Sequence, residues 1–469
     1  MRAFLTLVAL ALGLSAPGWA SEPVDARAVA EHLAASMRFR TISHQNPADF
    51  EAGPFEALHG YLRETYPRTF ASLRVRRVGG YSLLLEWPGK AASLQPVLFM
   101  SHTDVVPVEP GTEDEWTHPA FDGVVADGVI WGRGAVDNKN GVIAWLEAVE
   151  RLLAEGFVPK RTVYFAFGHD EEVGGHRGAG AMAALLREEG VRFEFILDEG
   201  GFVVEDSPIL PGRLVAMVNI AEKTYFTVYL RARGEGGHSS TPPRHTAIGK
   251  LASALHRLEA EPMPARLSGP IREMFAAVAP EMSGVQGWVM RNLWLTEPLV
   301  LRSMRGDSTS DAMVRTTTAI TIFDAGVKEN VLPQEAVATV NFRLLPGDSP
   351  EEVLAHIERT IDDPEITIEE RPWRLAPEPA RTDTRGFDVI RRAVHSVHPD
   401  AVVVPGLVTG ATDTLHYADL SDDIYRFLGA RLSMDEVSGF HGTNERTRLE
   451  AFADAIRIST QILRLTTSQ

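Results

Sequence analysis

The chain has 469 residues, and its 63 acidic side chains outnumber its 46 basic ones to give a formal net charge of −17. This excess of negative charge disfavours binding to nucleic acid or to an anionic membrane surface, because both present phosphate groups that repel it. Cysteine is absent, which excludes disulfides, thiolate nucleophiles and cysteine-ligated zinc, so any metal must be held by His, Asp and Glu.

Residues 1–20 predict a signal peptide that is removed on export. Arg2 precedes an apolar run, and Gly18 and Ala20 supply the small residues of a cleavage site. The alternative is an uncleaved N-terminal anchor, but the apolar run is short for a membrane span. We therefore expect a periplasmic or secreted protein that has no membrane contact once the peptide is removed.

Strand and helix patterns alternate from about residue 25 to residue 220, which predicts an α/β fold. Apolar and β-branched runs predict buried strands at residues 96–100, 161–167 and 192–197. Helical spacing of the apolar residues predicts helices at 140–155 and 179–189.

The pattern changes near residue 222. Alternating strands at 224–233 and 336–345, a third strand at 365–370 and helices at 246–260 and 349–361 give a β-α-β-β-α-β-like order, with further helical sequence at 270–306. A proline-rich segment at 372–379 resembles a linker that returns to the first domain. We therefore predict a discontinuous α/β domain, residues 22–221 and 376–469, into which a smaller α+β domain of ferredoxin-like type, residues 222–375, is inserted.

Acidic and histidine residues follow the predicted strands of the first domain. In open α/β sheets, ligands bind in the crevice at the carboxyl ends of the strands. Four such segments lie in the first domain and a fifth near the C-terminus: 101–106 (SHTDVV), 132–140 (GRGAVDNKN), 168–175 (GHDEEVGG), 197–201 (LDEGG) and 438–446 (SGFHGTNER).

Each of these segments is a weak signal by itself. A histidine beside an aspartate is more often a hydrogen-bonded turn than a metal ligand, and the adjacent Glu171 and Glu172 are more often a solvated helix start. Taken together they are more informative, because carboxylates crowded at a strand end repel one another unless a cation compensates. Without thiols, His and carboxylate are the zinc ligands that remain, and they suit hydrolytic sites.

In order and approximate spacing, the five segments resemble those of the M20 family of metallopeptidases and amidohydrolases, and AFGHDEEVGG and LDEGG are most similar to its carboxypeptidase S and PM20D1 branch. The resemblance implies a zinc-exopeptidase-like catalytic domain with an inserted lid or dimerisation domain. It also implies hydrolysis of an amide or peptide bond next to a free carboxylate, in a peptide or an N-acyl amino acid. The sequence does not separate a carboxypeptidase from an N-acyl-amino-acid amidohydrolase.

The resemblance implies a pair of zinc ions, with Mn²⁺ or Co²⁺ as alternatives. The implied ligands are His102 and Asp198 for one ion, Glu172 and His441 for the other, and Asp137 as the bridge. Asp104 is then expected to hydrogen-bond the His102 imidazole and fix its tautomer. Glu171 is the expected general base, which takes a proton from the metal-bridging water and returns it to the leaving amine. A cis peptide is expected between Asp137 and Asn138.

Further matches concern the substrate. His238, in the GGHSS segment at 236–240, resembles a family histidine that reaches the active site of a neighbouring subunit and stabilises the oxyanion, which implies a homodimer formed through the inserted domain. A polar loop after a strand is the alternative for this segment. Asn330 and Arg343 resemble substrate-binding residues, and the planar guanidinium of Arg343 suits a substrate carboxylate. Arg343 is equally consistent with a surface cation.

Gly410 begins the segment GATDTLHY at 410–417, which resembles a substrate-binding loop that often reads GGTDTRHY. Leu415 stands where relatives tend to have Arg, and Ala411 replaces Gly. This departure leaves open how the substrate carboxylate is held and whether the substrate is more apolar.

Other motifs were weighed against this interpretation. The segment GAGAMA at 178–183 does not follow a strand, as a dinucleotide fingerprint would, and a G-x-S-x-G nucleophile elbow is absent. His395 and His398 fit a solvated amphipathic helix better than a metal face. Two alternative functions stay open: a small-molecule deacylase of the acetylornithine or succinyl-diaminopimelate type, and a non-catalytic binding protein on the same fold.

Overall fold

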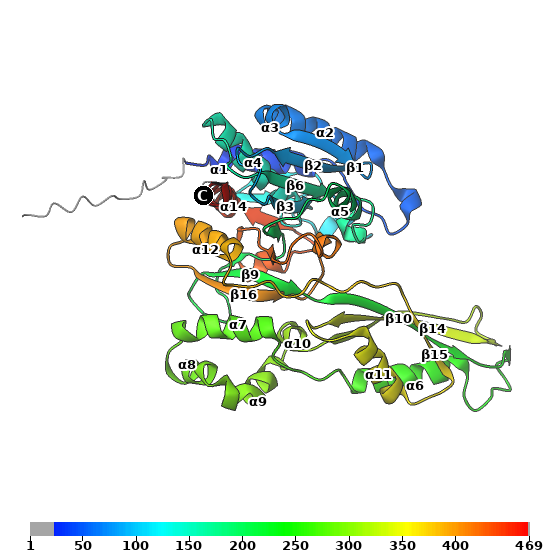
Figure 1. Ribbon diagram of the computed structural model, residues 1–469. Coiled ribbons are helices and arrows are strands. Elements are labelled where there is room, and N and C mark those ends of the chain that lie inside the picture. Colours follow the sequence, from blue (N-terminus) through cyan, green and yellow to red (C-terminus); the bar gives the residue numbers. More distant parts are fainter. Residues whose placement is uncertain (1–22, 468–469) are drawn as a thin grey trace, which may run out of the picture.

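The computed structural model describes residues 23–467 of the chain (Figure 1). The predicted signal peptide lies outside the described residues, and export stays a prediction. Within the described range, no helix is long and apolar enough to cross a membrane.

Residues 23–467 form two principal β-sheets. The larger is a ten-stranded mixed sheet with the strand order β1–β2–β6–β3–β7–β17–β9–β8–β18. Its tenth strand, β16, pairs with β9. Its central strands β6, β3, β7 and β17 run parallel to one another. The strands are β1 (Arg74–Val78), β2 (Ser82–Trp87), β3 (Val97–His102), β6 (Val163–Gly168), β7 (Ile196–Asp198), β8 (Val203–Val204), β9 (Val215–Glu222), β16 (Val402–Val408), β17 (Ile424–Arg426) and β18 (Arg431–Leu432).

Helices cover both faces of the larger sheet, because its central strands are apolar on both sides. On one face Phe99 of β3 stacks on Trp145 with ring centroids 4.4 Å apart. On the other face Leu98 and Met100 share a buried cluster with Met182. The first face is covered by α1 (Ala26–Met37), α2 (Ala52–Thr65), α3 (Pro67–Ser72), α4 (Lys139–Ala154), α12 (Arg385–Val397) and α14 (Leu449–Thr467), and the second by α5 (Ala179–Glu188).

The predicted α/β pattern is confirmed, and the largest displacement of a boundary is at β7. Strand β7 begins at Ile196 rather than at residue 192. The preceding residues make isolated hydrogen bonds instead of a ladder: the Phe193 amide donates to Leu420 O and the Glu194 amide to Pro96 O.

The smaller sheet is antiparallel, with the order β12–β14–β10–β15. Its strands are β10 (Thr224–Arg233), β12 (Thr317–Ala325), β14 (Glu335–Leu344) and β15 (Ile366–Glu370), and α6 (Ala247–Ala260) and α11 (Pro350–Ile361) share its core. The predicted β-α-β-β-α-β order is therefore present, and residues 372–379 run back to α12 without regular structure. The domain boundaries at 221/222 and 375/376 stay a prediction.

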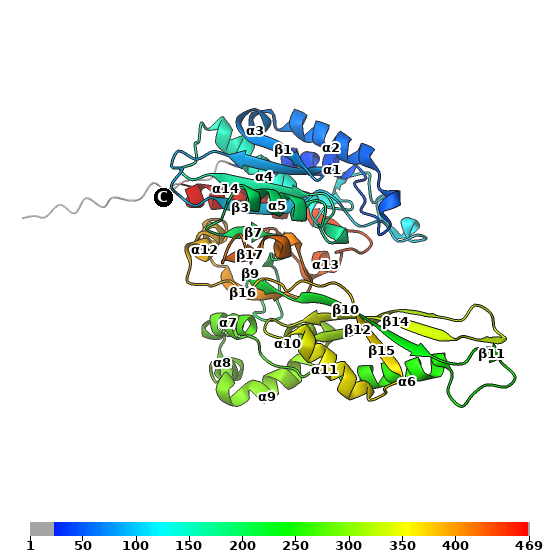
Figure 2. The same cartoon turned by 45° about the vertical axis from the view of Figure 1, so that its right-hand side comes forward.

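Further helices follow α6 before β12: α7 (Gly269–Val278), α8 (Gly284–Arg291), α9 (Leu293–Met304) and α10 (Ser308–Val314). Although they lie between elements of the smaller sheet in the sequence, α7 packs on β16 of the larger sheet (Figure 2). Ile271 and Phe275 share a buried cluster there with Val404 and Leu407. This helical segment thus covers the outer part of the larger sheet.

Two small sheets complete the fold. One joins β4 (Val124–Ala126), β5 (Val129–Trp131) and β19 (Arg446–Arg448), and the other pairs β11 (Gly237–His238) with β13 (Val331–Leu332). The first of them brings the C-terminal segment beside residues 129–137, where the predicted metal ligand Asp137 lies.

Candidate metal centre

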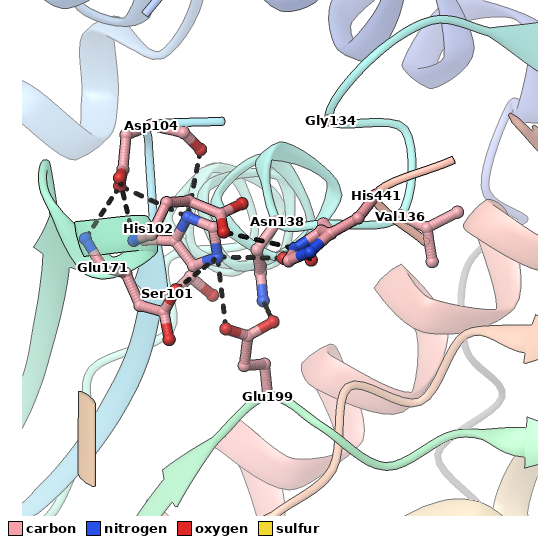
Figure 3. Close-up of polar contacts among 12 residues, drawn as sticks. Ser101, His102, Asp104, Gly134, Val136, Asn138, Glu171, Glu199 and His441 are labelled. Carbon is pink, nitrogen blue, oxygen red and sulfur yellow. Dashed lines mark hydrogen bonds and ion pairs between the residues drawn. The ribbon is translucent and has the colours of Figure 1, made fainter. Parts of the chain in front are cut away.

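His102 is the last residue of β3 and its side chain lies among carboxylates at the carboxyl ends of the parallel strands (Figure 3). Its Nε2 is 3.0 Å from Asp137 Oδ1 and 3.2 Å from Glu199 Oε1. Glu171 Oε2 is more distant, at 3.9 Å. Three loops, which follow β5, β6 and β7, thus bring carboxylates to one imidazole nitrogen.

His441 approaches the same carboxylate of Asp137 from the other side. Its Nε2 is 3.0 Å from Asp137 Oδ2 and 3.2 Å from Glu172 Oε2. The two oxygens of Asp137 therefore face two different imidazoles, one each. We call the six residues that these contacts join the central cluster: His102, Asp137, Glu171, Glu172, Glu199 and His441.

Of the two adjacent acids, it is the Glu199 carboxylate that contacts His102 Nε2, while the predicted role of Asp198 as a metal ligand stays a prediction. Within the described residues, the Asp198 carboxylate has no contact with either imidazole of the central cluster, and its Oδ2 is buried without a hydrogen-bond partner. Burial and the neighbouring charge of Glu199 raise its pKa to about 7. Glu199 also accepts a hydrogen bond from Asn138 Nδ2, which fixes its side chain beside His102.

Asp104 orients both His102 and the loop that carries the two glutamates. His102 Nδ1 donates to the Asp104 backbone oxygen at 3.0 Å, which leaves Nε2 free to bind a metal. The Asp104 carboxylate accepts from the backbone amides of Glu171 (3.2 Å) and Glu172 (3.1 Å) and from Ser43 Oγ (2.6 Å). Burial acts to raise the pKa of Asp104, but its bonds with His102 and Ser43 hold it below the usual value.

The central cluster holds more carboxylates than its own imidazoles can neutralise. Burial, followed by the charges of nearby carboxylates, raises the pKa of Glu171 well above its usual value and that of Glu172 to about 7. Hydrogen bonds to Asp137 and Glu172 raise the pKa of His441 to about 10. One buried oxygen of Glu172, Oε1, has no partner.

The raised pKa values of the two glutamates and the unpartnered oxygen of Glu172 indicate that the central cluster needs additional positive charge. The pairing of imidazole nitrogens with carboxylate oxygens matches the ligand set of catalytic zinc and related divalent cations. Two three-residue groups have donor atoms close enough to hold an ion, namely His102, Asp137 and Glu172, and His102, Glu171 and Glu199. A pair of divalent cations therefore fits the residues present.

A buried glutamate that sequence reasoning did not assign holds the loop before Asp137. Glu445 Oε1 accepts from the backbone amides of Gly134 (3.0 Å), Val136 (2.8 Å) and Asp137 (3.1 Å). The peptide that follows, between Asp137 and Asn138, is cis as expected.

Arg133 links the same glutamate to the loop of His441. Its Nη1 donates to Glu445 Oε2 at 2.8 Å, and its Nη2 donates to the backbone oxygens of His441 (3.3 Å) and Gly442 (3.1 Å). The Arg133–Glu445 pair therefore ties together the two loops that carry Asp137 and His441. The sequence signal that could have indicated this role is the position of Glu445, four residues after His441 in the segment SGFHGTNER at 438–446.

Replacing Glu445 by Ala is expected to lower the affinity for metal by about 10–100-fold, because the loop that aims Asp137 loses its acceptor. Competition with a chromophoric chelator measures this affinity. Glu436 of α13 (Met434–Val437) is a matched control, since it is a buried carboxylate that pairs with Arg448 and not with the central cluster. Wild-type affinity in Glu445→Ala, or an equal loss in Glu436→Ala, would contradict the role of Glu445.

Two of the residues predicted to contact substrate, His238 and Asn330, lie apart from the central cluster. His238 is exposed in β11, toward the far end of the smaller sheet (Figure 2), and its Nδ1 lies 2.8 Å from Ser240 Oγ. Asn330 directly precedes β13, and its Oδ1 is buried without a partner. Within the described residues, no contact joins either side chain to the cluster.

Arg343 is half-buried on β14, with its guanidinium 4.5 Å from the centre of the Tyr225 ring. Burial lowers its pKa, while the charges of Tyr225, Glu222 and Glu171 act in the opposite direction. The guanidinium is therefore within electrostatic reach of the acidic groups at the site, although it makes no direct contact with them.

The loop that begins at Gly410 lies against the segment that carries Glu171 and Glu172. Thr412 and Thr414 bond to the buried Glu222, which pairs with Arg426 at 3.2 Å. His416 Nε2 donates to Gly174 O at 2.9 Å. Asp413 is buried against Gly168 and Gly175, and burial raises its pKa well above the usual value. Leu415 is half-buried, and its effect on substrate choice stays open.

Comparison with known proteins shows which family the chain belongs to. The model of peptidase family M20/M25/M40 matches residues 98–465. A probable carboxypeptidase S-like 2 of Dictyostelium discoideum is 39% identical over 434 residues, which cover 91% of this chain and 83% of that protein. The N-fatty-acyl-amino acid synthase/hydrolase PM20D1 of Mus musculus is 38% identical over 436 residues, 92% of this chain and 86% of that protein.

A solved structure has the same fold. The M20 family metallo-carboxypeptidase Sso-CP2 from Sulfolobus solfataricus superimposes with a TM-score of 0.69 at 18% sequence identity, covering 94% of this chain and 99% of that one. The family match spans most of the chain, and the predicted resemblance to the carboxypeptidase S and PM20D1 branch is confirmed. The chain belongs to peptidase family M20/M25/M40 and is a hydrolytic enzyme of that family.

Proposed function

We propose that the protein hydrolyses the amide bond between an acyl group and an amino acid whose carboxylate is free, with two divalent metal ions at the central cluster. The observation that carries this proposal is the Asp137 carboxylate, which faces His102 with one oxygen and His441 with the other at 3.0 Å each. The relatives named as carboxypeptidase S-like and as N-fatty-acyl-amino acid synthase/hydrolase support this choice of bond.

In this proposal the metals are zinc, with Mn²⁺ or Co²⁺ as alternatives. The ligands would be His102 and Glu199 for one ion, Glu172 and His441 for the other, and Asp137 shared between them. Glu199 replaces Asp198 in this set because its carboxylate lies 3.2 Å from His102 Nε2. When bound, two such ions lower the pKa of a water molecule and polarise the scissile carbonyl.

Glu171 is the general base of the proposed reaction. Its carboxylate is buried beside the cluster, and Oε2 lies 3.9 Å from His102 Nε2. The carboxylate takes a proton from the attacking water and donates it to the nitrogen of the leaving amino acid. Asp104 holds the Glu171 amide and therefore positions this base.

The substrate-binding part of the proposal rests on the family resemblance. Arg343 would pair with the free carboxylate of the substrate, with Asn330 and the loop at Gly410 lining the acyl or amino-acid side. His238 is exposed and remote from the cluster of its own chain, which is consistent with its acting in the site of a second copy in a homodimer.

Metal analysis and a substrate panel test the proposal. The purified enzyme is expected to hold two equivalents of divalent metal and to hydrolyse N-acyl amino acids or dipeptides, and chelation should abolish this activity until metal is restored. The panel should vary the acyl chain from acetyl to long fatty acyl and include acetylornithine and succinyl-diaminopimelate. Activity that survives chelation would contradict the metal mechanism, and a strict preference for the last two substrates would favour the deacylase alternative.

A further inference from the structure

Helices α8 and α9 present a group of large apolar side chains to solvent. Val285 and Trp288 of α8 are 79% and 52% exposed, and Trp294, Leu295 and Leu299 of α9 are 81%, 56% and 65% exposed. We call these five residues the α8–α9 face. Both views place the two helices at the outer edge of the molecule, beyond α7 (Figures 1 and 2). Exposed apolar groups of this size in a soluble protein usually mark an interaction surface.

Helix α9 carries apolar side chains beyond the side that packs on the fold. Thr296 and Val300 are buried, and Val300 packs in the cluster shared by α7 and β16. Leu295 and Leu299, one helical turn apart, point away from that cluster. An ordinary surface helix carries polar residues on its outer side, whereas a helix apolar all round is covered by protein or lipid. Packing against the fold therefore accounts for only one side of α9.

Positive charge borders the α8–α9 face. Arg302 and Arg305, at the end of α9, are exposed, and neither side chain has an acidic partner within residues 23–467. The glutamate of α9, Glu297, is paired with Arg272 at 2.7 Å and so does not neutralise them. This apolar surface therefore carries free cationic groups on a chain whose net charge is −17.

We propose that the α8–α9 face binds the surface of an anionic phospholipid layer. Tryptophan and leucine side chains would enter the headgroup region while Arg302 and Arg305 pair with lipid phosphates, as in amphipathic helices that lie in the membrane interface. The net negative charge of the chain disfavours membrane binding overall. An anionic lipid surface therefore repels the other, acidic faces, and the α8–α9 face is the one that docks. The proposal depends on neither the metals nor the proposed reaction.

A second copy of the chain fits the face less well. In a two-fold symmetric contact, the same patch meets itself. Where the axis of such a contact passes the end of α9, Arg302 and Arg305 come near their copies, and like charges brought together at an interface are costly. Phosphate groups, in contrast, supply the missing partner for both arginines.

Flotation of the full chain with vesicles tests the proposal. The chain is expected to bind vesicles of phosphatidylcholine mixed with phosphatidylglycerol more strongly than vesicles of phosphatidylcholine alone, with a blue shift of tryptophan emission and weaker binding at high salt. The double variant Trp294→Ser/Leu299→Ser should lower the partition coefficient by about tenfold. The variant Arg302→Glu/Arg305→Glu should remove the preference for phosphatidylglycerol.

A matched control distinguishes binding by the α8–α9 face from non-specific binding by any exposed apolar side chain. Ile322 and Val327, near the smaller sheet, are 53% and 95% exposed, and Ile322→Ser/Val327→Ser should leave vesicle binding unchanged. Equal binding by the Trp294/Leu299 variant and the wild type would overturn the proposal. A lipid-free dimer that the same variant converts to monomer in sedimentation would also overturn it, because the face would then be a contact between copies.

Discussion

Replacing Glu171 by Gln is expected to reduce kcat by about 10²–10⁴-fold while both metal ions stay bound. The amide has the shape of the carboxylate but cannot accept the proton of the attacking water, which is the contribution that a general base makes. Glu172, its neighbour, contacts His441 Nε2 at 3.2 Å and should keep that side of the cluster intact. Turnover of an N-acyl amino acid and metal content of the same sample measure the two effects separately.

Glu188 at the end of α5 offers a control, since Glu188→Gln changes an exposed glutamate outside the 3-10 turn Glu171–Val173 that carries Glu171, and this variant should keep full activity. The assignment of Glu171 fails if Glu171→Gln retains wild-type turnover. Loss of one metal equivalent together with activity would instead make Glu171 a ligand, as its membership of a group with His102 and Glu199 allows.

Replacing Glu199 by Ala should release one metal equivalent and lower kcat by about 10²–10³-fold, the equivalent of several kcal/mol of lost charge stabilisation. The carboxylate that lies 3.2 Å from His102 Nε2 is then missing. Asp198→Asn should keep both ions and most of the activity, because the Asp198 side chain is not part of the central cluster and Asn preserves its shape.

The variants of the adjacent residues Glu199 and Asp198 are thus expected to differ in metal content and activity, so each serves as the control for the other. The reverse result, in which Asp198→Asn loses metal and Glu199→Ala keeps it, would restore the ligand set implied by the family resemblance. Circular dichroism of both variants distinguishes loss of metal from loss of fold.

Much of the fold was predictable because its signals are local. The apolar run of β3, the helical spacing of α4 and the alternation of β10 and β14 each determine an element without reference to distant residues. The four residues His102, Asp137, Glu172 and His441 each lie within a recognisable motif, and their role as metal ligands stays a prediction. The structure brings both imidazoles to the Asp137 carboxylate, although the motifs that carry them lie far apart in the chain.

The choice between Asp198 and Glu199 was not predictable in this way. Asp198 is the last residue of β7 and Glu199 follows the strand, and it is the Glu199 carboxylate that lies 3.2 Å from His102 Nε2. Which one does so depends on how β7 pairs with β3, where Leu98 lies opposite Ile196 and Phe99 opposite Leu197. A one-residue shift of that pairing would exchange the two acids, and local sequence does not determine it.

The role of Glu445 and the packing of α7 were missed for a related reason. A glutamate that holds a loop 308 residues earlier in the chain leaves no periodic signal around itself. The helical character of residues 270–306 was expected, but not that α7 would pack on β16, because that contact joins segments from the two predicted domains. Long-range contacts of this kind require the three-dimensional structure.

The position of β17 has a consequence for how the enzyme is made. This strand, residues 424–426, lies between β7 and β9 in the middle of the larger sheet, while His441 and Glu445 follow it in the sequence. A chain emerging from the ribosome therefore has a gap in its main sheet until nearly all of it has been synthesised, and such non-local pairing is slow. The larger sheet and the central cluster therefore cannot be complete before residues 424–445 have been synthesised.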